Sequence, residues 1–322
     1  MLRNYSTNHT THRHQDENGE ISLCTLAAIN WGKIKKPEDF RKPCELVVRA
    51  LNELLDYQDY MVPAAEKGTM KRRPLGVGII NFAYWLAKND SNYSNPNLEL
   101  IHEYAEAWSY YLIKASNDLA KERGEYIEAH EDSKYCSGIV PIDTYKKSVD
   151  ELVKPKYNMD WKTLREDLDN YGIYNSTLMA LMPSETSSQI SGATNGIEPP
   201  RSLVPVKQSK DGVLKQVVPE IRKLKNKYEL LWDQASPEGY LKICAVLQKF
   251  IDQAISVNTS YNPKYYEDGK IPMSVMLQHM LMHYKYGGKT LYYCNVNDGA
   301  TDENLDLELG ELDENECDSC KI

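Results

Sequence analysis

Apolar residues recur at helical spacing along most of the chain. From Pro37 the pattern predicts a helix that ends before Pro63, with an apolar face made by Leu46, Val47, Leu51, Leu54 and Leu55. The same periodicity predicts further helices at residues 76–88, 98–123, 161–171, 240–257 and 272–286. Gly124 and Gly287-Gly288 follow two of these segments, as expected at helix C-termini.

Three shorter apolar runs predict β-strands, at residues 21–29, 176–182 and 289–296. We expect the first to be buried, and the second to end at Pro183, which has no amide hydrogen for a ladder. Residues 129–144 are expected to be irregular, and residues 201–222 to form a loop with at most one short strand pairing. Because helical stretches separate the strands, the sequence predicts parallel pairing with helical crossovers, and therefore an α/β fold.

The two ends of the chain differ from its middle. Residues 1–19 are polar and have no apolar period. Residues 295–322 hold ten Asp or Glu and a single lysine, and so account for the entire net charge of −9. We therefore predict a flexible lead-in at residues 1–19, a folded domain at residues 20–297 and a flexible acidic tail at residues 298–322.

The charge pattern and the length of the apolar runs exclude two classes of partner. Outside the tail the chain is formally neutral, so it has no basic surplus with which to neutralise nucleic-acid phosphates. No run reaches the eighteen apolar residues of a membrane span, and the polar N-terminus is not that of a signal peptide. We expect a cytoplasmic protein that binds neither nucleic acid nor membrane.

Seven cysteines do not suit a secreted disulfide framework, because the number is odd and most are widely spaced. Cys317 and Cys320 stand apart as a CxxC pair in the acidic tail, a spacing that suits thiol-disulfide exchange. Structural zinc usually takes two such pairs, and the sequence has one, so we expect no metal site.

A serine- and threonine-rich loop follows the second predicted strand. Its hydroxyls and backbone amides lie at the start of a predicted helix, where Thr186 and Gln189 fit a capping box. A helix N-terminus attracts anions, although an ordinary helix cap explains the same residues.

Two other motifs are weaker. His279 and His283 have the spacing of a zinc protease, but Met280 occupies the position of the catalytic Glu, which favours structural or surface roles. Gly76-Val77-Gly78 lacks the third glycine of a dinucleotide-binding loop.

Four segments together resemble the large, catalytic subunit of class I (class Ia) ribonucleotide reductases, in the order that the family has them. They are residues 17–26 (ENGEISLCTL), 182–201 (MPSETSSQISGATNGIEPPR), 289–295 (KTLYYCN) and 317–322 (CDSCKI). The resemblance extends over nearly everything from residue 17 onward and identifies residues 20–297 with the C-terminal half of the family's catalytic domain. It implies a helix-rich fold, the second half of a ten-stranded α/β barrel.

The resemblance also implies roles for single residues. The family's loop binds the substrate diphosphate, a role that falls here on Pro183, Ser184, Glu185, Thr186 and Ser187. The family's paired tyrosines, here Tyr292 and Tyr293, relay a radical. Their rings must then approach each other, which requires a departure from the regular pleat. Without the family, core packing would explain both tyrosines.

The cysteines take redox roles by the same resemblance. Cys24, otherwise an inert buried thiol, becomes one of two cysteines whose oxidation to a disulfide supplies the electrons that reduce the ribose. Cys317 and Cys320 form a swinging arm that reduces this disulfide and is itself reduced by thioredoxin or glutaredoxin.

The family's Asn-x-Cys-x-Glu loop, which carries the thiyl radical, does not occur in these residues. The resemblance therefore implies a tightly bound partner, the N-terminal half of the large subunit, as from a split gene, although an expression fragment would look the same. A small subunit of the diiron-tyrosyl kind would supply the radical, ribonucleoside diphosphates would be the substrates, and this chain would bind no cofactor itself.

Two other classes of function stay open. A non-catalytic scaffold or regulatory fragment that binds the reductase subunits would show no dependence on nucleotides. A free-standing thiol oxidoreductase would need its CxxC at the start of a helix rather than in an acidic tail.

Overall fold

The computed structural model describes residues 19–23, 25–209 and 212–299, and the side chains of residues 206–215 are not described. The predicted lead-in and acidic tail therefore lie outside the described residues, apart from Gly19, Asp298 and Gly299. The helices are α1 (Arg41–Tyr57), α2 (Pro63–Arg72), α3 (Phe82–Lys88), α4 (Leu98–Arg123), α5 (Pro141–Thr144), α6 (Trp161–Tyr171), α7 (Glu185–Ile190), α8 (Ile221–Leu224), α9 (Glu238–Gln248) and α10 (Met273–Lys285). The strands are β1 (Thr25–Asn30), β2 (Leu75–Ile80), β3 (Val206–Ser209), β4 (Gly212–Lys215), β5 (Ser256–Tyr261) and β6 (Thr290–Val296).

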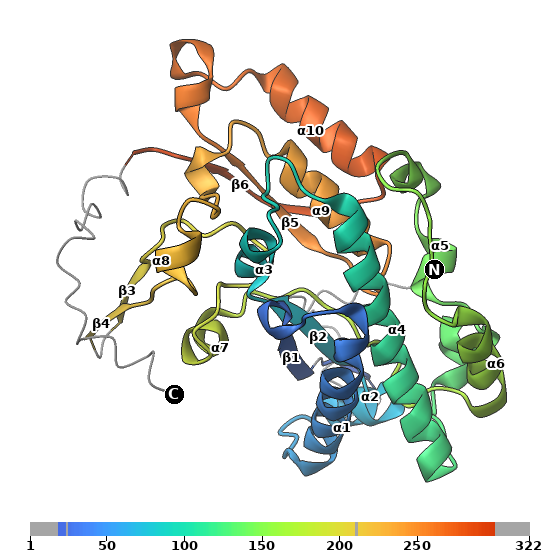
Figure 1. The fold of residues 1–322 in the computed structure, drawn as a ribbon. Helices are drawn as coiled ribbons and strands as arrows, with labels where there is room; N and C mark the ends of the chain where they lie inside the picture. Colours follow the sequence, from blue (N-terminus) through green and yellow to red (C-terminus); the bar gives the residue numbers. More distant parts are fainter. Residues whose placement is uncertain (1–18, 24, 210–211, 300–322) are drawn as a thin grey trace.

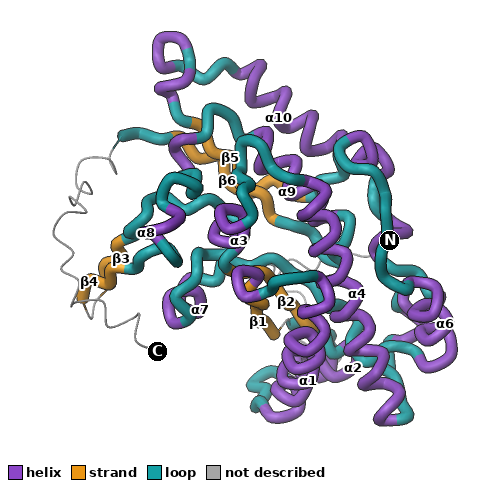
Figure 2. The backbone as a smooth tube through the Cα atoms, in the orientation of Figure 1, coloured by secondary structure: helices purple, strands orange, loops and turns teal. Residues whose placement is uncertain are grey.

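The described strands form three two-stranded sheets (Figures 1 and 2). β1 pairs with β2 and β5 pairs with β6, both in parallel, whereas β3 and β4 form an antiparallel hairpin. Helices α1 and α2 connect the first parallel pair, and α10 connects the second. The helix-rich α/β class and its parallel pairing are thus confirmed, as is the single short pairing within residues 201–222.

Strand β2 replaces the first half of the helix predicted at residues 76–88, so that prediction was wrong for residues 76–80. All six residues of LGVGII are buried, and a strand buried on both faces shows no alternation of polar and apolar positions. Its two glycines and its β-branched residues also disfavour a helix. The helical prediction holds only for the remaining residues, which form α3.

The strand predicted at residues 176–182 is present only as a short extended segment against β2. Val77 bridges Met179 in parallel, the Leu75 amide donates to the Thr177 carbonyl at 2.9 Å, and the Val77 amide donates to the Leu178 carbonyl at 2.8 Å. β2 is therefore paired along both edges, with β1 on the other side.

Helix α1 buries only part of the face that was predicted. Cys44, Val48, Leu51 and Leu55 are buried, whereas Leu46 and Leu54, which the periodicity placed in the core, are exposed. Both sets satisfy helical spacing, and only the position of the β1–β2 sheet decides between them.

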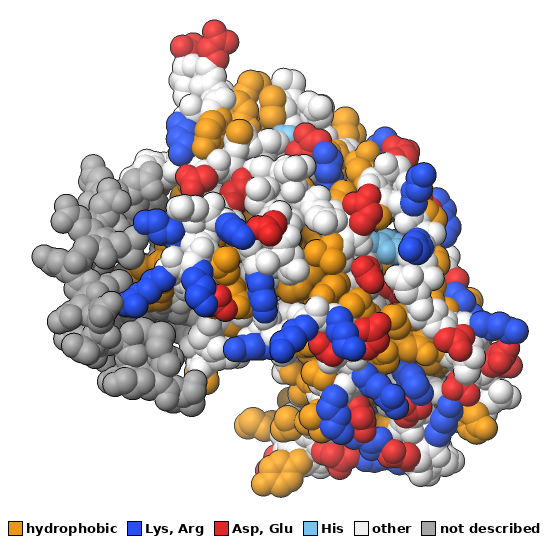
Figure 3. All heavy atoms as spheres, viewed as in Figure 1, with side chains coloured by type: hydrophobic (Ala, Val, Ile, Leu, Met, Phe, Trp, Pro, Cys, Tyr) orange, Lys and Arg blue, Asp and Glu red, His pale blue; other side chains and the backbone are white. Residues whose placement is uncertain are grey.

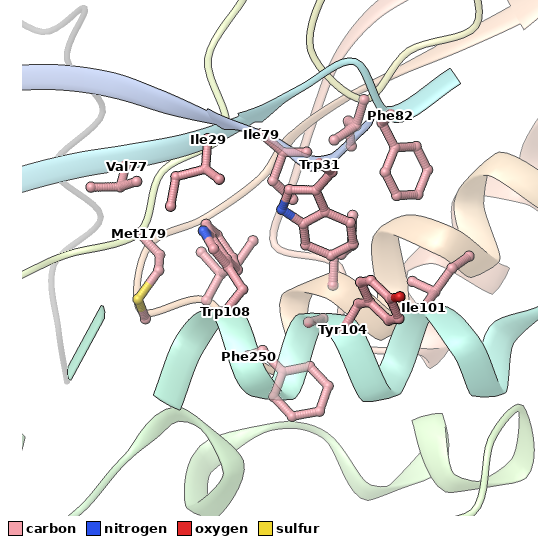
Figure 4. Close-up of a cluster of buried hydrophobic side chains, with 14 of the residues drawn as sticks. Ile29, Trp31, Val77, Ile79, Phe82, Ile101, Tyr104, Trp108, Met179 and Phe250 are labelled. Atoms are coloured by element: carbon pink, nitrogen blue, oxygen red, sulfur yellow. The ribbon is translucent and has the colours of Figure 1, made fainter. Parts of the chain in front are cut away.

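Helix α4 begins and ends at the predicted residues, and Gly124 follows it in the left-handed region with φ of 67°. Together with the β1–β2 sheet it encloses an aromatic core (Figure 4). Trp31 lies at the centre, with its ring centroid 5.3 Å from those of both Phe40 and Trp85. The predicted helices at residues 161–171 and 272–286, and the strand at residues 289–296, are confirmed as α6, α10 and β6 within one residue at either end.

Two further predictions need correction. β1 begins at Thr25 rather than residue 21 and is only partly buried, with Leu26 exposed. The helix predicted at residues 240–257 stops at Gln248, because the side chain of this residue closes a loop. Its Oε1 accepts a hydrogen bond from the Ile255 amide at 3.0 Å, and its Nε2 donates to the Gln253 carbonyl at 2.8 Å. Ile255 is buried within this loop, and strand β5 follows it.

Asp252, in the same loop, holds the segment beside β2 in place. Its carboxylate accepts hydrogen bonds from the Leu178 amide at 2.7 Å, the Met179 amide at 3.1 Å and the Tyr135 hydroxyl at 3.0 Å. Burial outweighs these three donors and raises the pKa of Asp252 to about 6.

This pKa predicts how stability depends on pH. A carboxyl whose pKa is higher in the folded than in the unfolded chain stabilises the fold below its unfolded pKa, and this contribution is lost as the pH rises through its folded pKa. Relative to Asp252→Asn, the wild type should lose about 2 kcal/mol of unfolding free energy between pH 4 and pH 7. Urea unfolding of both proteins across this range measures it, and a constant difference would show that the carboxyl does not ionise there.

Candidate functional site

The candidate site lies at the carboxyl ends of β1 and β2, where Asn81 connects three segments. The Asn81 side-chain amide donates to Asn30 Oδ1 at the end of β1, at 3.0 Å, and its Oδ1 accepts the Thr194 amide at 3.0 Å. Its own amide donates to the Thr194 carbonyl at 2.8 Å. Asn81 has φ of 65°, a left-handed conformation that Asn tolerates better than most residues. It thereby fixes the loop of residues 182–201, called here the serine loop, against the sheet edge.

Gly78 lets the serine loop leave the sheet. A Cβ at this position would lie 2.8 Å from the Ala180 carbonyl oxygen and 2.4 Å from Met182 Sδ. Any larger residue would therefore push the start of the loop away from β2. The Gly76-Val77-Gly78 sequence is thus part of a buried strand and serves close packing.

Helix α7 begins at Glu185, so the predicted capping box at Thr186 and Gln189 is wrong. Ser184 occupies the N-cap position, but its side chain accepts no hydrogen bond from the helix. Instead the Ser184 amide donates to Asn195 Oδ1 at 2.7 Å, which ties the start of the helix to the far side of the loop. The Ser187 hydroxyl also turns back and donates to the Ser184 carbonyl, at 2.9 Å.

The five predicted phosphate-binding residues lie together around the first turn of α7. Pro183, Glu185, Thr186 and Ser187 are exposed and Ser184 is buried. Ser184 Oγ has no hydrogen-bond partner within the described part of the chain. A buried hydroxyl beside the first amides of a helix can contribute to holding an anion.

Tyr292 and Tyr293 lie in a β-bulge, the departure from regular pleating that a contact between their rings requires. Val257 pairs with Leu291 and Thr259 pairs with Cys294, so two tyrosines on β6 face the single residue Asn258 on β5. The bulge places both rings on the same side, with centroids 4.1 Å apart.

The two phenols are in direct contact. The Tyr293 hydroxyl donates to the Tyr292 hydroxyl at 3.2 Å, and this hydrogen bond raises the pKa of Tyr293 above its usual value of 10. Tyr292 is 54% exposed and Tyr293 is 57% exposed, so neither ring is a core residue. The expectation from packing alone, that these tyrosines fill the core, is wrong.

Two functional candidates, Asn258 and Glu198, were not found from the sequence. Asn258 Oδ1 accepts the Tyr293 amide at 3.0 Å, and its Nδ2 donates to Glu198 Oε1 at 2.6 Å. Because Glu198 belongs to the serine loop, Asn258 joins the loop to the tyrosine pair. The one available signal was an asparagine in the middle of an otherwise β-favouring segment.

The remaining predicted site residues, Cys24, Cys317 and Cys320, lie outside the described residues.

Within the described ranges, no three His, Cys, Asp or Glu side chains gather as a metal site would require. None of the helices in these ranges is both long and apolar enough to cross a membrane.

His279 and His283 are buried and have the structural roles that were expected. The His279 ring contacts the Tyr261 hydroxyl at 3.1 Å through Nδ1 and the Ser236 hydroxyl at 3.2 Å through Nε2, and burial lowers its pKa. The His283 ring packs over Gly288, where a Cβ would lie within 2.4 Å of three ring atoms.

Comparison with known proteins gives the same family as the sequence motifs. The family model described as ribonucleotide reductase, barrel domain, matches residues 5–229 and 221–294. The ribonucleoside-diphosphate reductase subunit alpha of Haemophilus influenzae is 56% identical over 296 residues, which are 92% of this chain and 39% of that protein. The ribonucleoside-diphosphate reductase 1 subunit alpha of Escherichia coli K12 is 53% identical over 271 residues, covering 83% of this chain and 35% of that protein.

A phage protein extends the same relationship. The ribonucleoside-diphosphate reductase subunit alpha of Enterobacteria phage T4 is 45% identical over 310 residues, or 94% of this chain and 40% of that protein. The chain thus spans about two fifths of the length of the relatives it matches. By the match of its sequence to the barrel domain, over most of its length, this chain belongs to the ribonucleotide reductase family.

Proposed function

We propose that this chain is the C-terminal part of the large subunit of a class I ribonucleoside-diphosphate reductase, and that it works with a second chain that completes the active site. The observation that carries this proposal is the contact between the Tyr292 and Tyr293 phenols in the β6 bulge. The bulge brings the hydroxyl oxygens of two half-exposed tyrosines to 3.2 Å from each other. Core packing does not explain this contact, whereas a radical relay requires it.

The contact suits transfer of a hydrogen atom between the two rings. A phenoxyl radical on one tyrosine takes the electron and the proton of the neighbouring O–H together, so the first becomes a phenol and the second a phenoxyl radical. No net charge forms, and the proton moves along a hydrogen bond that already exists. The radical would enter from a small subunit of the diiron-tyrosyl kind and leave toward a thiyl cysteine on the partner chain.

The serine loop would hold the diphosphate of the substrate. α7 begins at Glu185, so its first amides lie beside Ser184, whose buried hydroxyl has no partner within the described residues. Pro183, Glu185, Thr186 and Ser187 complete the exposed surface of this turn. Asn81 and Gly78 would preorganise the loop, because Gly78 lets its start pack closely against β2 and Asn81 holds Thr194, farther along the loop, at the end of that strand.

Cysteines would supply the reducing electrons. Oxidation of Cys24 and a cysteine of the partner chain to a disulfide releases two electrons and two protons, which convert the ribose 2'-hydroxyl to water and a C–H bond. Cys317 and Cys320 would then reduce that disulfide by thiol-disulfide exchange and be reduced in turn by thioredoxin or glutaredoxin.

Since the relatives come from bacteria and a phage, we place the enzyme in a bacterial or phage-infected cytoplasm.

The partner would be the N-terminal part of the large subunit, with the Asn-x-Cys-x-Glu loop that this sequence lacks. Two features of the described structure support such a partner. β1 pairs with β2 along one edge and no other described strand pairs with it, and an open strand edge accepts a further strand. Apolar side chains are also exposed at the α1 end of the molecule (Figure 3), among them Leu54, Tyr57 and Met61.

Substitution of each tyrosine by phenylalanine tests the radical relay. Tyr292→Phe and Tyr293→Phe keep the ring and remove only a solvent-accessible hydroxyl, so folding and partner binding should survive. Because phenylalanine has no O–H and is far harder to oxidise, nucleotide reduction in the reconstituted complex should fall about a hundredfold or more. Complex formation and turnover should be measured on the same preparations.

Tyr265→Phe is the matched control, since this exposed tyrosine also donates a single hydrogen bond, to the Asp233 carbonyl at 2.8 Å. It should keep wild-type turnover, and the chain without its partner should reduce nothing. Substantial turnover by Tyr292→Phe or Tyr293→Phe would show that the tyrosine in question is not a relay. Binding of partner chains with no nucleotide reduction under any condition would favour a scaffold.

A second experiment separates the cysteine roles. Cys317→Ser or Cys320→Ser should abolish turnover driven by thioredoxin but leave much of the turnover driven by a small dithiol that enters the site directly. Cys24→Ser should allow at most one turnover with either reductant, because the internal disulfide cannot form. Cys136→Ser serves as the control, since this half-buried thiol lies outside the proposed site. Equal loss with both reductants in the tail variants would argue against a shuttle.

A further inference from the structure

The β6 bulge leaves one backbone group without its usual ladder partner, and a side chain takes that place. At a bulge two residues face one, so one amide of the longer strand has no carbonyl opposite it. Here the Tyr293 amide donates instead to Asn258 Oδ1 on β5, at 3.0 Å. The position of the Tyr293 backbone therefore depends on the Asn258 side chain.

The other end of the Asn258 amide is anchored just as specifically. Its Nδ2 donates to Glu198 Oε1 at 2.6 Å, a charge-assisted hydrogen bond of the stronger kind. Glu198 is itself held by its neighbour, because Ile197 is buried and its carbonyl accepts the hydroxyl of the buried Tyr93 at 2.9 Å. A chain of contacts thus leads from the core through the serine loop to the tyrosine pair.

Asparagine is suited to this position for a chemical reason. The site needs an acceptor facing a backbone amide and a donor facing a carboxylate, and a short primary amide presents both. Aspartate has the same shape but no donor, and would place a second carboxylate next to Glu198. Ser260, two residues further along the same face of β5, makes only an ordinary cross-strand contact, with Asn295 Nδ2 at 3.4 Å.

We infer that Asn258 is a positioning residue that holds the Tyr292–Tyr293 pair in contact and, through Glu198, ties it to the serine loop. This inference rests on the proposed function only for its catalytic consequence, since the geometric role stands by itself. Both rings are more than half exposed, so surrounding side chains cannot fix them as a core would. The polar contacts behind the bulge must do so.

An exchange of donor and acceptor tests the inference. Asn258→Asp should break the link, because the introduced carboxylate repels Glu198. Glu198→Gln combined with Asn258→Asp should restore it, because the introduced amide now donates to the introduced carboxylate, whose second oxygen can accept the Tyr293 amide. Ser260→Ala is the control that removes a cross-strand side-chain contact outside the bulge.

The first readout needs no activity. Incorporation of 3-fluorotyrosine at position 293 of the full chain gives a ¹⁹F chemical shift that depends on the ring current of Tyr292, and a Tyr292→Leu background gives the value without contact. Asn258→Asp should move the signal toward that value, the double variant should return it, and Ser260→Ala should leave it unchanged.

The second readout is turnover of the reconstituted complex. Asn258→Asp should lower kcat about tenfold or more, as expected from loss of a hydrogen bond to a charged group, with a smaller effect on the KM of the diphosphate. The double variant should regain most of this loss. A general loss of folding would not be rescued by reversing the polarity of one hydrogen bond.

The outcomes distinguish the positioning role of Asn258 from the radical relay. If Asn258→Asp leaves the ¹⁹F signal at its wild-type position, or if the double variant restores neither signal nor turnover, Asn258 does not position the pair. If the signal moves and is rescued while Asn258→Asp and Tyr292→Phe both keep full turnover, the positioning role stands and the radical relay is wrong.

Discussion

Burial of β2 along its whole length is the constraint on which the rest of the structure depends. A strand with no access to water must pair its amides and carbonyls along both edges, because each unpaired buried group is costly. β1 satisfies one edge and the segment around Met179 satisfies the other, held there by the carboxylate of Asp252. Since the three segments run in parallel, the chain leaves them all at the same edge. Asn81 and the serine loop lie there for that reason.

The sequence predicted those elements that carry a clear periodicity or end signal of their own. Helix α4 could be bounded to the residue because its apolar residues recur at helical spacing and Gly124 supplies the left-handed C-cap. β2 could not, because complete burial erases the alternation by which strands are identified. α1 shows an intermediate case, in which the helix was correct and its buried face was correct only in part, since Leu51 and Leu55 are buried but Leu46 and Leu54 are exposed. Two apolar faces satisfied the same period, and only the sheet decides between them.

The candidate site, too, could be predicted from the sequence only in part. The contact between Tyr292 and Tyr293, and with it a departure from the regular pleat, was expected only from the family resemblance, because no pattern in the sequence itself indicates the bulge that produces the contact. Asn81 and Asn258 were missed because their roles depend on partners distant in sequence. Thr194 is 113 residues from Asn81, and Glu198 is 60 residues from Asn258. Only the fold brings them together.

The tyrosine pair is held from one side only, and this arrangement has a consequence for how the site can work. Rings in a core are fixed by neighbours in all directions, but these two are more than half exposed and depend on polar contacts with β5 and the serine loop. Hydrogen bonds are directional, so they can hold an exposed backbone at a bulge where nonspecific packing could not. The exposed face of the rings then stays available to a second polypeptide. The divided site proposed for this chain would need this combination, because each chain would have to keep its reactive groups in place before the other binds.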